Sequence, residues 1–203
     1  MDKLLQSDFI DYLKILDPNV KNIKIGYIRT DVIDDKHFDI QDLQPTIKQI
    51  LGTGSVTYNN PLSKIIAIVD YEDFLNKQPA SVIKALELRK PDFIVYNLGT
   101  KSFFILNELS QSKNPKNKQN DAILQLNDAL KHFYRVTAIK TFIDSFSNKR
   151  CIFSNRNHPI NSPDTIADPF EYIQGLLQPP IKLNFQPITK LGFELIETNV
   201  IDV

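Results

Sequence analysis

The sequence predicts a mixed α/β fold in which helices flank a central sheet. Residues 64–71 form an apolar run without alternation, as in a strand buried on both faces. Residues 92–97 and 102–110 resemble two strands on either side of a short turn. Residues 121–146 carry a broad apolar stripe at helical spacing, which indicates a long helix packed on that sheet.

The other elements of this fold are predicted from local periodicity. Apolar residues three and four apart predict a helix over residues 3–16, and residues 21–29 alternate as in a strand. We expect residues 40–51 to form a helix and residues 79–88 to form another, with proline in its first turn. A buried strand over residues 149–155 follows the long helix.

The C-terminal part of the chain has a different sequence pattern from the rest. Residues 181–187 and 192–200 alternate as in a β-hairpin. We therefore expect one domain over residues 1–203, with a core at 64–156 and a C-terminal β-hairpin extension within 157–203.

Composition excludes several classes of protein. Hydrophobic residues make up 42% of the 203 residues and charged residues 24%, as in ordinary globular domains. No apolar run reaches the roughly 18 residues of a membrane span, and the N-terminus lacks a signal-peptide pattern. Cys151 is the single cysteine, so we expect no internal disulfide and a buried core thiol. These features predict a cytoplasmic protein without a membrane partner.

The predicted hairpin brings two acids together. Gly99 can supply the positive φ that its turn requires. Antiparallel pairing about Gly99 and Thr100 makes paired residue numbers sum to about 199 or 200, so Asp92 faces Asn107 or Glu108. Because neighbouring carboxylates repel each other, such a pair indicates a bound cation, and Mg2+ prefers oxygen ligands. In the alternative interpretation Asp92 is a turn residue and Glu108 a solubilising charge on an edge strand.

The hairpin resembles the PD-(D/E)XK superfamily of restriction and repair nucleases. In that pattern Pro-Asp opens one strand, Glu-x-Lys lies on the next, and a helix and another strand follow. Here Pro91-Asp92 matches the first part, and Glu108-Leu109-Ser110 stands in the second, with serine at the lysine position. The match covers about residues 80–156. It implies a restriction-endonuclease-like core and a metal-dependent nuclease in which Asp92 and Glu108 bind Mg2+ or Mn2+.

The substituted lysine needs a replacement if the resemblance extends to catalysis. In the family this lysine helps to activate the attacking water and to stabilise charge on the phosphate. Lys113 and Lys118 are candidates to supply the positive charge, with Lys113 ranked as a catalytic residue, and Ser110 could orient water. Residues 111–156 carry nine Lys or Arg against three Asp or Glu, which favours phosphate contacts through Lys113, Lys116 and Lys118.

Two further acids, Asp70 and Glu87, are candidates for this site. Asp70 either joins it or caps the helix that follows, and Glu87 is a candidate extra acid. Nucleic acid is the expected partner, with DNA favoured over RNA, and a homodimer is compatible with the sequence. Two alternatives stay open: a catalytically inactive nuclease-fold protein that binds nucleic acid or protein, and an unrelated α/β protein that matches the motif by chance.

Overall fold

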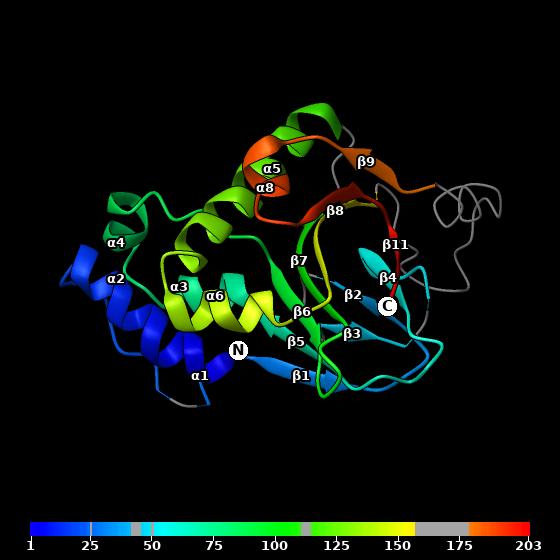
Figure 1. The fold of residues 1–203 in the computed structure, drawn as a ribbon, viewed down its shortest axis with the longest axis horizontal. Coiled ribbons are helices and arrows are strands. Elements are labelled where there is room, and N and C mark those ends of the chain that lie inside the picture. Colours follow the sequence, from blue (N-terminus) through cyan, green and yellow to red (C-terminus); the bar gives the residue numbers. More distant parts are fainter. Residues whose placement is uncertain (25, 42–45, 50, 111–114, 157–178) are drawn as a thin grey trace.

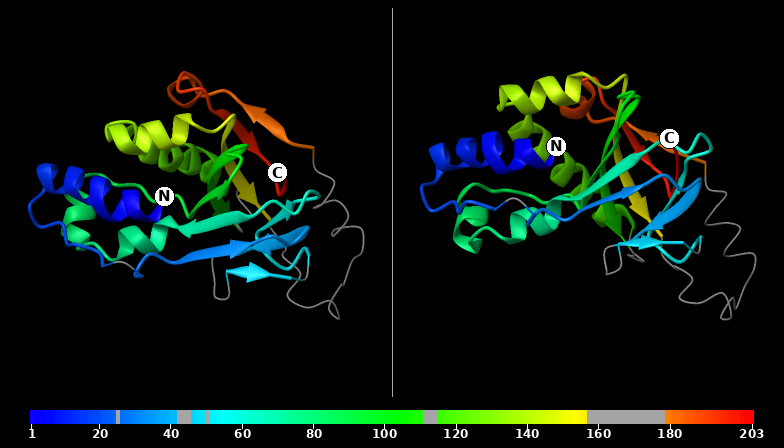
Figure 2. Two further views of the ribbon diagram at one scale, coloured as in Figure 1. Left: turned by 60° about the horizontal axis from the view of Figure 1, so that its bottom comes forward. Right: turned by 90° about the horizontal axis from the view of Figure 1, so that it is seen from below.

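The computed structural model describes residues 1–24, 26–41, 46–49, 51–110, 115–156 and 179–203. Its strands form a seven-stranded and a four-stranded sheet (Figure 1). Helices cover one face of the seven-stranded sheet, and the four-stranded sheet covers the other (Figure 2). This three-layer arrangement confirms the predicted mixed α/β class. It also contains a second sheet, which was not predicted from the sequence.

The seven-stranded sheet is mixed. Strand β8 is parallel to β7, and β10 is parallel to β8, while the other neighbours are antiparallel. A parallel neighbour requires a crossover, which helices α5 (Pro115–Phe133) and α6 (Thr137–Asp144) provide between β7 and β8. The strand order is β1 (Thr30–Ile33), β5 (Ile66–Asp70), β6 (Phe93–Asn97), β7 (Phe103–Ser110), β8 (Asn148–Asn155), β10 (Glu194–Glu197) and β9 (Ile181–Leu183).

The four-stranded sheet is joined to the larger one by the C-terminal segment. Two residues separate β10 from the last strand, and the chain crosses between the sheets there. The backbone N–H of Thr198 donates to Phe153 in the larger sheet (3.0 Å), and the carbonyl of Asn199 accepts from Thr57 in the smaller (2.9 Å). The strand order is β11 (Val200–Asp202), β4 (Val56–Asn59), β2 (His37–Ile40) and β3 (Ile47–Lys48).

The first helix is confirmed and anchors the helical layer. It is continuous from Asp2 to Leu16, with a π-helical turn over Leu5–Phe9. Phe9 is fully buried, and its ring lies 5.4 Å from that of Phe133 on α5. This first helix consists of α1 (Asp2–Leu4), η1 (Leu5–Phe9) and α2 (Ile10–Leu16). Three short helices come later in the chain: α3 (Tyr71–Asn76), α4 (Ala80–Ala85) and α8 (Gln186–Thr189).

Two predicted elements are wrong. Residues 21–29 are irregular where described, and at Lys21 the side chain of Gln78 bonds both the backbone N–H and the C=O in place of a strand neighbour. The predicted helix at 40–51 is replaced, where described, by strand pairing between Ile40 and Ile47. Pairing with a neighbouring strand has overridden the local helical spacing.

The predicted long helix is divided into α5 and α6. Val136 is extended (φ −103°, ψ 106°) and separates the two helices. Val136 and Thr137 are both β-branched, and such residues lose side-chain freedom in a helix. The break turns α6 so that Phe142 packs edge-to-face on Tyr96, with ring centroids 5.4 Å apart.

The predicted hairpin of β6 and β7 is confirmed, including its register. Gly99 has a φ of 91° in the turn, and Phe93 pairs with Asn107, so paired numbers sum to 200. Ile94 on β6 belongs to the core beneath the helices, and Val95 to the core beneath the second sheet. Even-numbered residues of this hairpin therefore face the helices.

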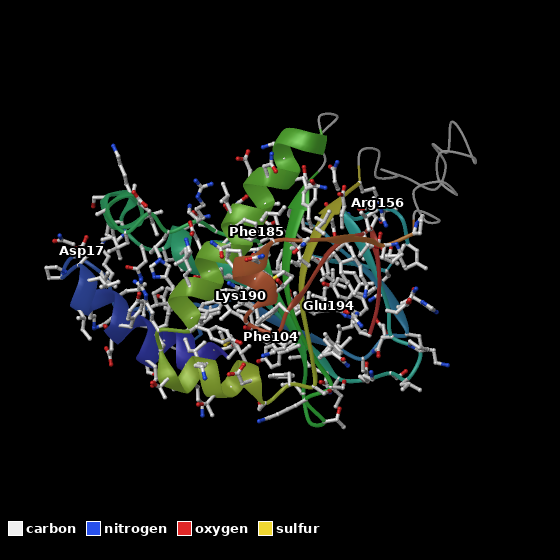
Figure 3. The ribbon with its side chains drawn as sticks, turned by 45° about the horizontal axis from the view of Figure 1, so that its top comes forward. Asp17, Phe104, Arg156, Phe185, Lys190 and Glu194 are labelled. Carbon is white, nitrogen blue, oxygen red and sulfur yellow. The ribbon has the colours of Figure 1, made fainter. Side chains whose placement is uncertain are left out.

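A buried ion pair joins the two sheets. Arg156, labelled in Figure 3, follows β8, and its Nη1 lies 3.0 Å from Oδ2 of the fully buried Asp39 on β2. The same carboxylate accepts the N–H of Gly54 (2.8 Å) and the hydroxyl of Thr57 (2.6 Å). Arg156 also donates to the carbonyl of Asn199 (3.1 Å). The network ties four separate segments together with matched donors and acceptors.

The C-terminal strands β9 and β10 pair antiparallel, as the predicted hairpin required, with α8 between them. They extend the larger sheet beside β8. Residues 157–178 lie outside the described part of the chain. Cys151 is fully buried on β8, as expected, and burial raises the pKa of its thiol. Within the described ranges, no helix is both long and apolar enough to cross a membrane.

Candidate functional site

Asp92 and Glu108 lie side by side at the open end of the hairpin. Continuing the Phe93–Asn107 register by one residue brings Asp92 opposite Glu108. The carboxylate of Asp92 is buried, and its Oδ2 accepts the backbone N–H of Leu109 at 2.5 Å. The carbonyl of Asp92 also accepts the N–H groups of Tyr71 and Glu72 (2.9 and 3.2 Å). Asp92 is thus fixed between the start of α3 and strand β7.

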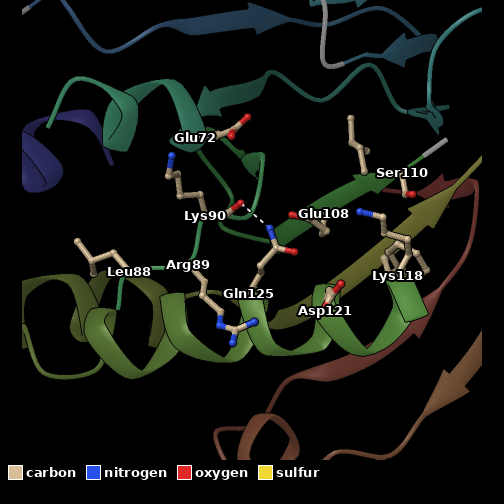
Figure 4. A pocket seen from close by; sticks show the side chains of 11 residues that line it. Glu72, Leu88, Arg89, Lys90, Glu108, Ser110, Lys118, Asp121 and Gln125 are labelled. Carbon is tan, nitrogen blue, oxygen red and sulfur yellow. Dashed lines mark hydrogen bonds between the residues drawn. The ribbon is translucent and has the colours of Figure 1, made fainter. Parts of the chain in front are cut away.

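Glu108 opens onto a hollow between β7 and α5 (Figure 4). This hollow, called here the Glu108 hollow, has a volume of about 410 Å³. Asp92 is buried and does not line this hollow, whereas the half-buried Glu108 does. The polar side chains that line it belong to Glu72, Arg89, Lys90, Glu108, Ser110, Lys118, Asp121 and Gln125.

Lys118 is the candidate lysine that the structure places at this hollow. It lies on α5, and in Figure 4 its side chain extends toward Glu108 and Ser110 of β7. Ser110, at the motif's lysine position, lines the same hollow. Lys113 lies outside the described residues. Lys116 is in α5, but its side chain is outside the described part.

Glu72 and Lys90 also line the Glu108 hollow, although the sequence did not predict them as site residues. Glu72 comes from the first turn of α3, and Lys90 from the segment before β6. Gln125 on α5 donates through Nε2 to the carbonyl of Lys90 (3.0 Å), which links the helix to that segment. A signal for Glu72 existed: it follows the end of β5, and pairing of β5 with β6 places that end beside Asp92.

Asp70 and Glu87 do not join this site. Asp70 caps α3, since its Oδ1 accepts the N–H of Asp73 at 2.7 Å, and it forms an ion pair with Arg29. The capping interpretation is therefore correct. Glu87 lines a neighbouring hollow instead.

The donor chemistry around Glu108 suits a hard cation. The carboxylates of Asp92 and Glu108 and the hydroxyl of Ser110 offer oxygen atoms, which Mg2+ and Mn2+ prefer over sulfur. Among the described residues, no three His, Cys, Asp or Glu side chains gather closely enough to hold a metal ion. An ion at this pair would take its remaining ligands from water, as Mg2+ commonly does.

Comparisons of this chain with models of protein families, with curated proteins and with solved structures found no match.

Proposed function

We propose that this chain is a metal-dependent phosphodiesterase that cleaves nucleic acid, with DNA as the favoured substrate. The observation that carries the proposal is the hairpin register, which brings Asp92 and Glu108 together beside a hollow that Lys118 also lines. The order of elements supports it as well. A Pro-Asp strand (β6), a Glu strand (β7), a helix (α5) and a further strand (β8) follow in the sequence that the PD-(D/E)XK pattern requires.

Each residue has a distinct role in this proposal. Asp92 and Glu108 would hold Mg2+ or Mn2+, with Asp92 kept in place by the N–H of Leu109. A divalent cation bound there lowers the pKa of a bound water and screens the charge of the phosphate. Lys118 supplies the positive charge that the family takes from its motif lysine. The Ser110 hydroxyl can orient a water molecule but carries no charge.

The test is calorimetric titration of Mn2+ and Mg2+ into the wild type and into Asp92→Asn/Glu108→Gln. We expect binding in the wild type and none in the double variant, because both metal-binding carboxylates become amides. Asn at position 92 keeps an oxygen that can accept the Leu109 N–H. The matched control is Glu72→Gln/Asp121→Asn, which removes two other acids of the Glu108 hollow and should bind metal as the wild type does.

Nicking of supercoiled plasmid, measured on the same proteins, completes the test. The wild type and the control should cleave with Mn2+ or Mg2+, and the Asp92/Glu108 variant should not. The proposal is contradicted if the wild type binds no metal either alone or in the presence of duplex DNA. Loss of binding in the control alone would move the metal to Glu72 or Asp121.

A specific observation favours a second candidate function. Ser110 stands where the family carries its catalytic lysine, so a catalytically inactive nuclease-fold protein that binds nucleic acid or protein is the alternative. DNA binding without metal binding or cleavage would select that function.

A further inference from the structure

A second hollow adjoins the Glu108 hollow and continues it along α5. Leu88 and Arg89 line both, so the two hollows are neighbours, and together they are called here the depression. The second hollow, called here the Lys84 hollow, has a volume of about 620 Å³ and lies between the end of α4, the segment that follows it, and α5. Its charged lining residues are Lys84, Glu87, Arg89, Asp128 and Lys131.

One face of α5 forms the wall of this depression. Lys118, Asp121, Gln125, Asp128 and Lys131 follow one another at spacings of three or four residues, which places them on one helix face. In Figure 4, the side chains of Lys118, Asp121, Gln125 and Arg89 follow one another along the helix. From Lys118 to Lys131 this face extends about 20 Å, at a rise of about 1.5 Å per residue.

The far end of the depression concentrates exposed cations. Arg89 Nε and Lys131 Nζ lie 3.3 and 3.0 Å from the two oxygens of Asp128. Both side chains are about half exposed (47% and 59%), while that of Asp128 is only 18% exposed. One carboxylate thus holds two cations at the rim and neutralises only one of them. Lys84, exposed on α4, adds a third cation, and the exposed Glu87 adds a second carboxylate, so three cations stand against two acids in the Lys84 hollow.

We propose that the Lys84 hollow binds a backbone phosphate of the nucleic acid whose scissile phosphate lies at Glu108. This inference rests on the proposed function, and it adds a remote subsite and a path for the strand along α5. Exposed Lys and Arg are suited to phosphate contacts of this kind, which position the duplex without reading its sequence. A B-form strand carries one phosphate per about 3.4 Å of axis, so about six phosphates span the 20 Å between the two ends.

The test measures binding of a fluorescein-labelled 20-base-pair duplex in EDTA, by anisotropy, across a series of salt concentrations. The variant Lys84→Gln/Arg89→Gln/Lys131→Gln removes the three cations. If each contacts a phosphate, the slope of log K against log salt should fall by up to about 2.7, at 0.9 per contact. The matched control, Lys3→Gln/Lys36→Gln/Lys190→Gln, makes the same change in net charge at exposed lysines outside both hollows and should keep the slope.

A single substitution tests the subsite even if the triple variant does not fold. Removing Arg89 and Lys131 together leaves Asp128 without two of its cations, whereas Lys84 forms no salt bridge with any described residue. Lys84→Glu should therefore fold normally by circular dichroism and still weaken binding. Equal slopes for the hollow variant and the control would overturn the subsite, as would a wild type that does not bind the duplex.

Plasmid cleavage separates this inference from the proposed function. A wild type that cleaves DNA while the folded hollow variant keeps the wild-type slope contradicts the subsite and leaves the function standing. A wild type that binds DNA without cleaving it contradicts the proposed function, and a reduced slope in the hollow variant would then still support the phosphate contacts.

Discussion

An arginine–aspartate pair lies on each side of the seven-stranded sheet, and the two pairs differ in burial. On the face toward the second sheet, the side chains of Arg156 and Asp39 are 6% and 0% exposed. On the helix face, those of Arg89 and Asp128 are 47% and 18% exposed. The N···O distances are similar, 3.0 and 3.3 Å. The same two residue types therefore stand in a closed network on one face and at an open hollow on the other.

The difference separates a structural role from a functional candidate. The Asp39 carboxylate is fully buried and accepts hydrogen bonds from three protein donors, namely Arg156, Gly54 and Thr57. Arg89 keeps half of its side chain in solvent, where an incoming phosphate can reach it. Charged residues indicate a binding site only when the space beside them is open.

Breaking the buried pair should have the largest effect. Arg156→Met leaves the Asp39 carboxylate buried without its cation, and removing one partner of such a pair typically costs about 3–5 kcal/mol. Arg89→Met is the matched control, since exposed pairs contribute about 0–1 kcal/mol. Urea unfolding of the three proteins gives the free energies of unfolding. Equal losses in both variants would show that burial does not distinguish the pairs.

The lysine of the Glu108 hollow gives the next prediction, a change in rate. Lys118→Gln should lower nuclease activity about 100-fold, at the lower end of the range for a positioned catalytic group, while metal binding persists. Lys118→Gln/Ser110→Lys should recover part of the loss, because both side chains line the same hollow. Lys190→Gln, at an exposed lysine outside both hollows, is the control for the rate. Full nuclease activity in Lys118→Gln would exclude a catalytic role for this lysine.

The smallest predicted effect concerns His132, at the margin of the helical layer. Its Nδ1 lies 3.0 Å from the hydroxyl of Tyr12, and burial, followed by the nearby Arg135, lowers its pKa. The unfolded chain therefore binds a proton more readily than the folded one, so stability should fall as the pH drops below about 6.5. Melting temperatures between pH 7 and 5 should decrease less for His132→Gln than for the wild type. Parallel curves would contradict this assignment.

Local sequence predicted the elements whose own pattern was strong. The first helix, the hairpin with Gly99 and its register were recovered because spacing, turn chemistry and alternation are local properties. The neighbourhood of Asp92 and Glu108 followed from the register alone. The break at Val136 and the strand at Ile47 were missed, because contacts with other segments decided them.

The sequence by itself determined which residues could do chemistry: the paired acids of the hairpin, the basic segment after it and the serine in the motif. Only the tertiary structure decided access. It placed Lys118 and Glu72 at the Glu108 hollow and made Asp70 a helix cap. It also buried Asp39 in an ion pair with Arg156. The physical reason is that solvent access and ion pairing depend on segments far apart in the chain, such as Arg156 and Asp39. No local pattern encodes which of those segments meet.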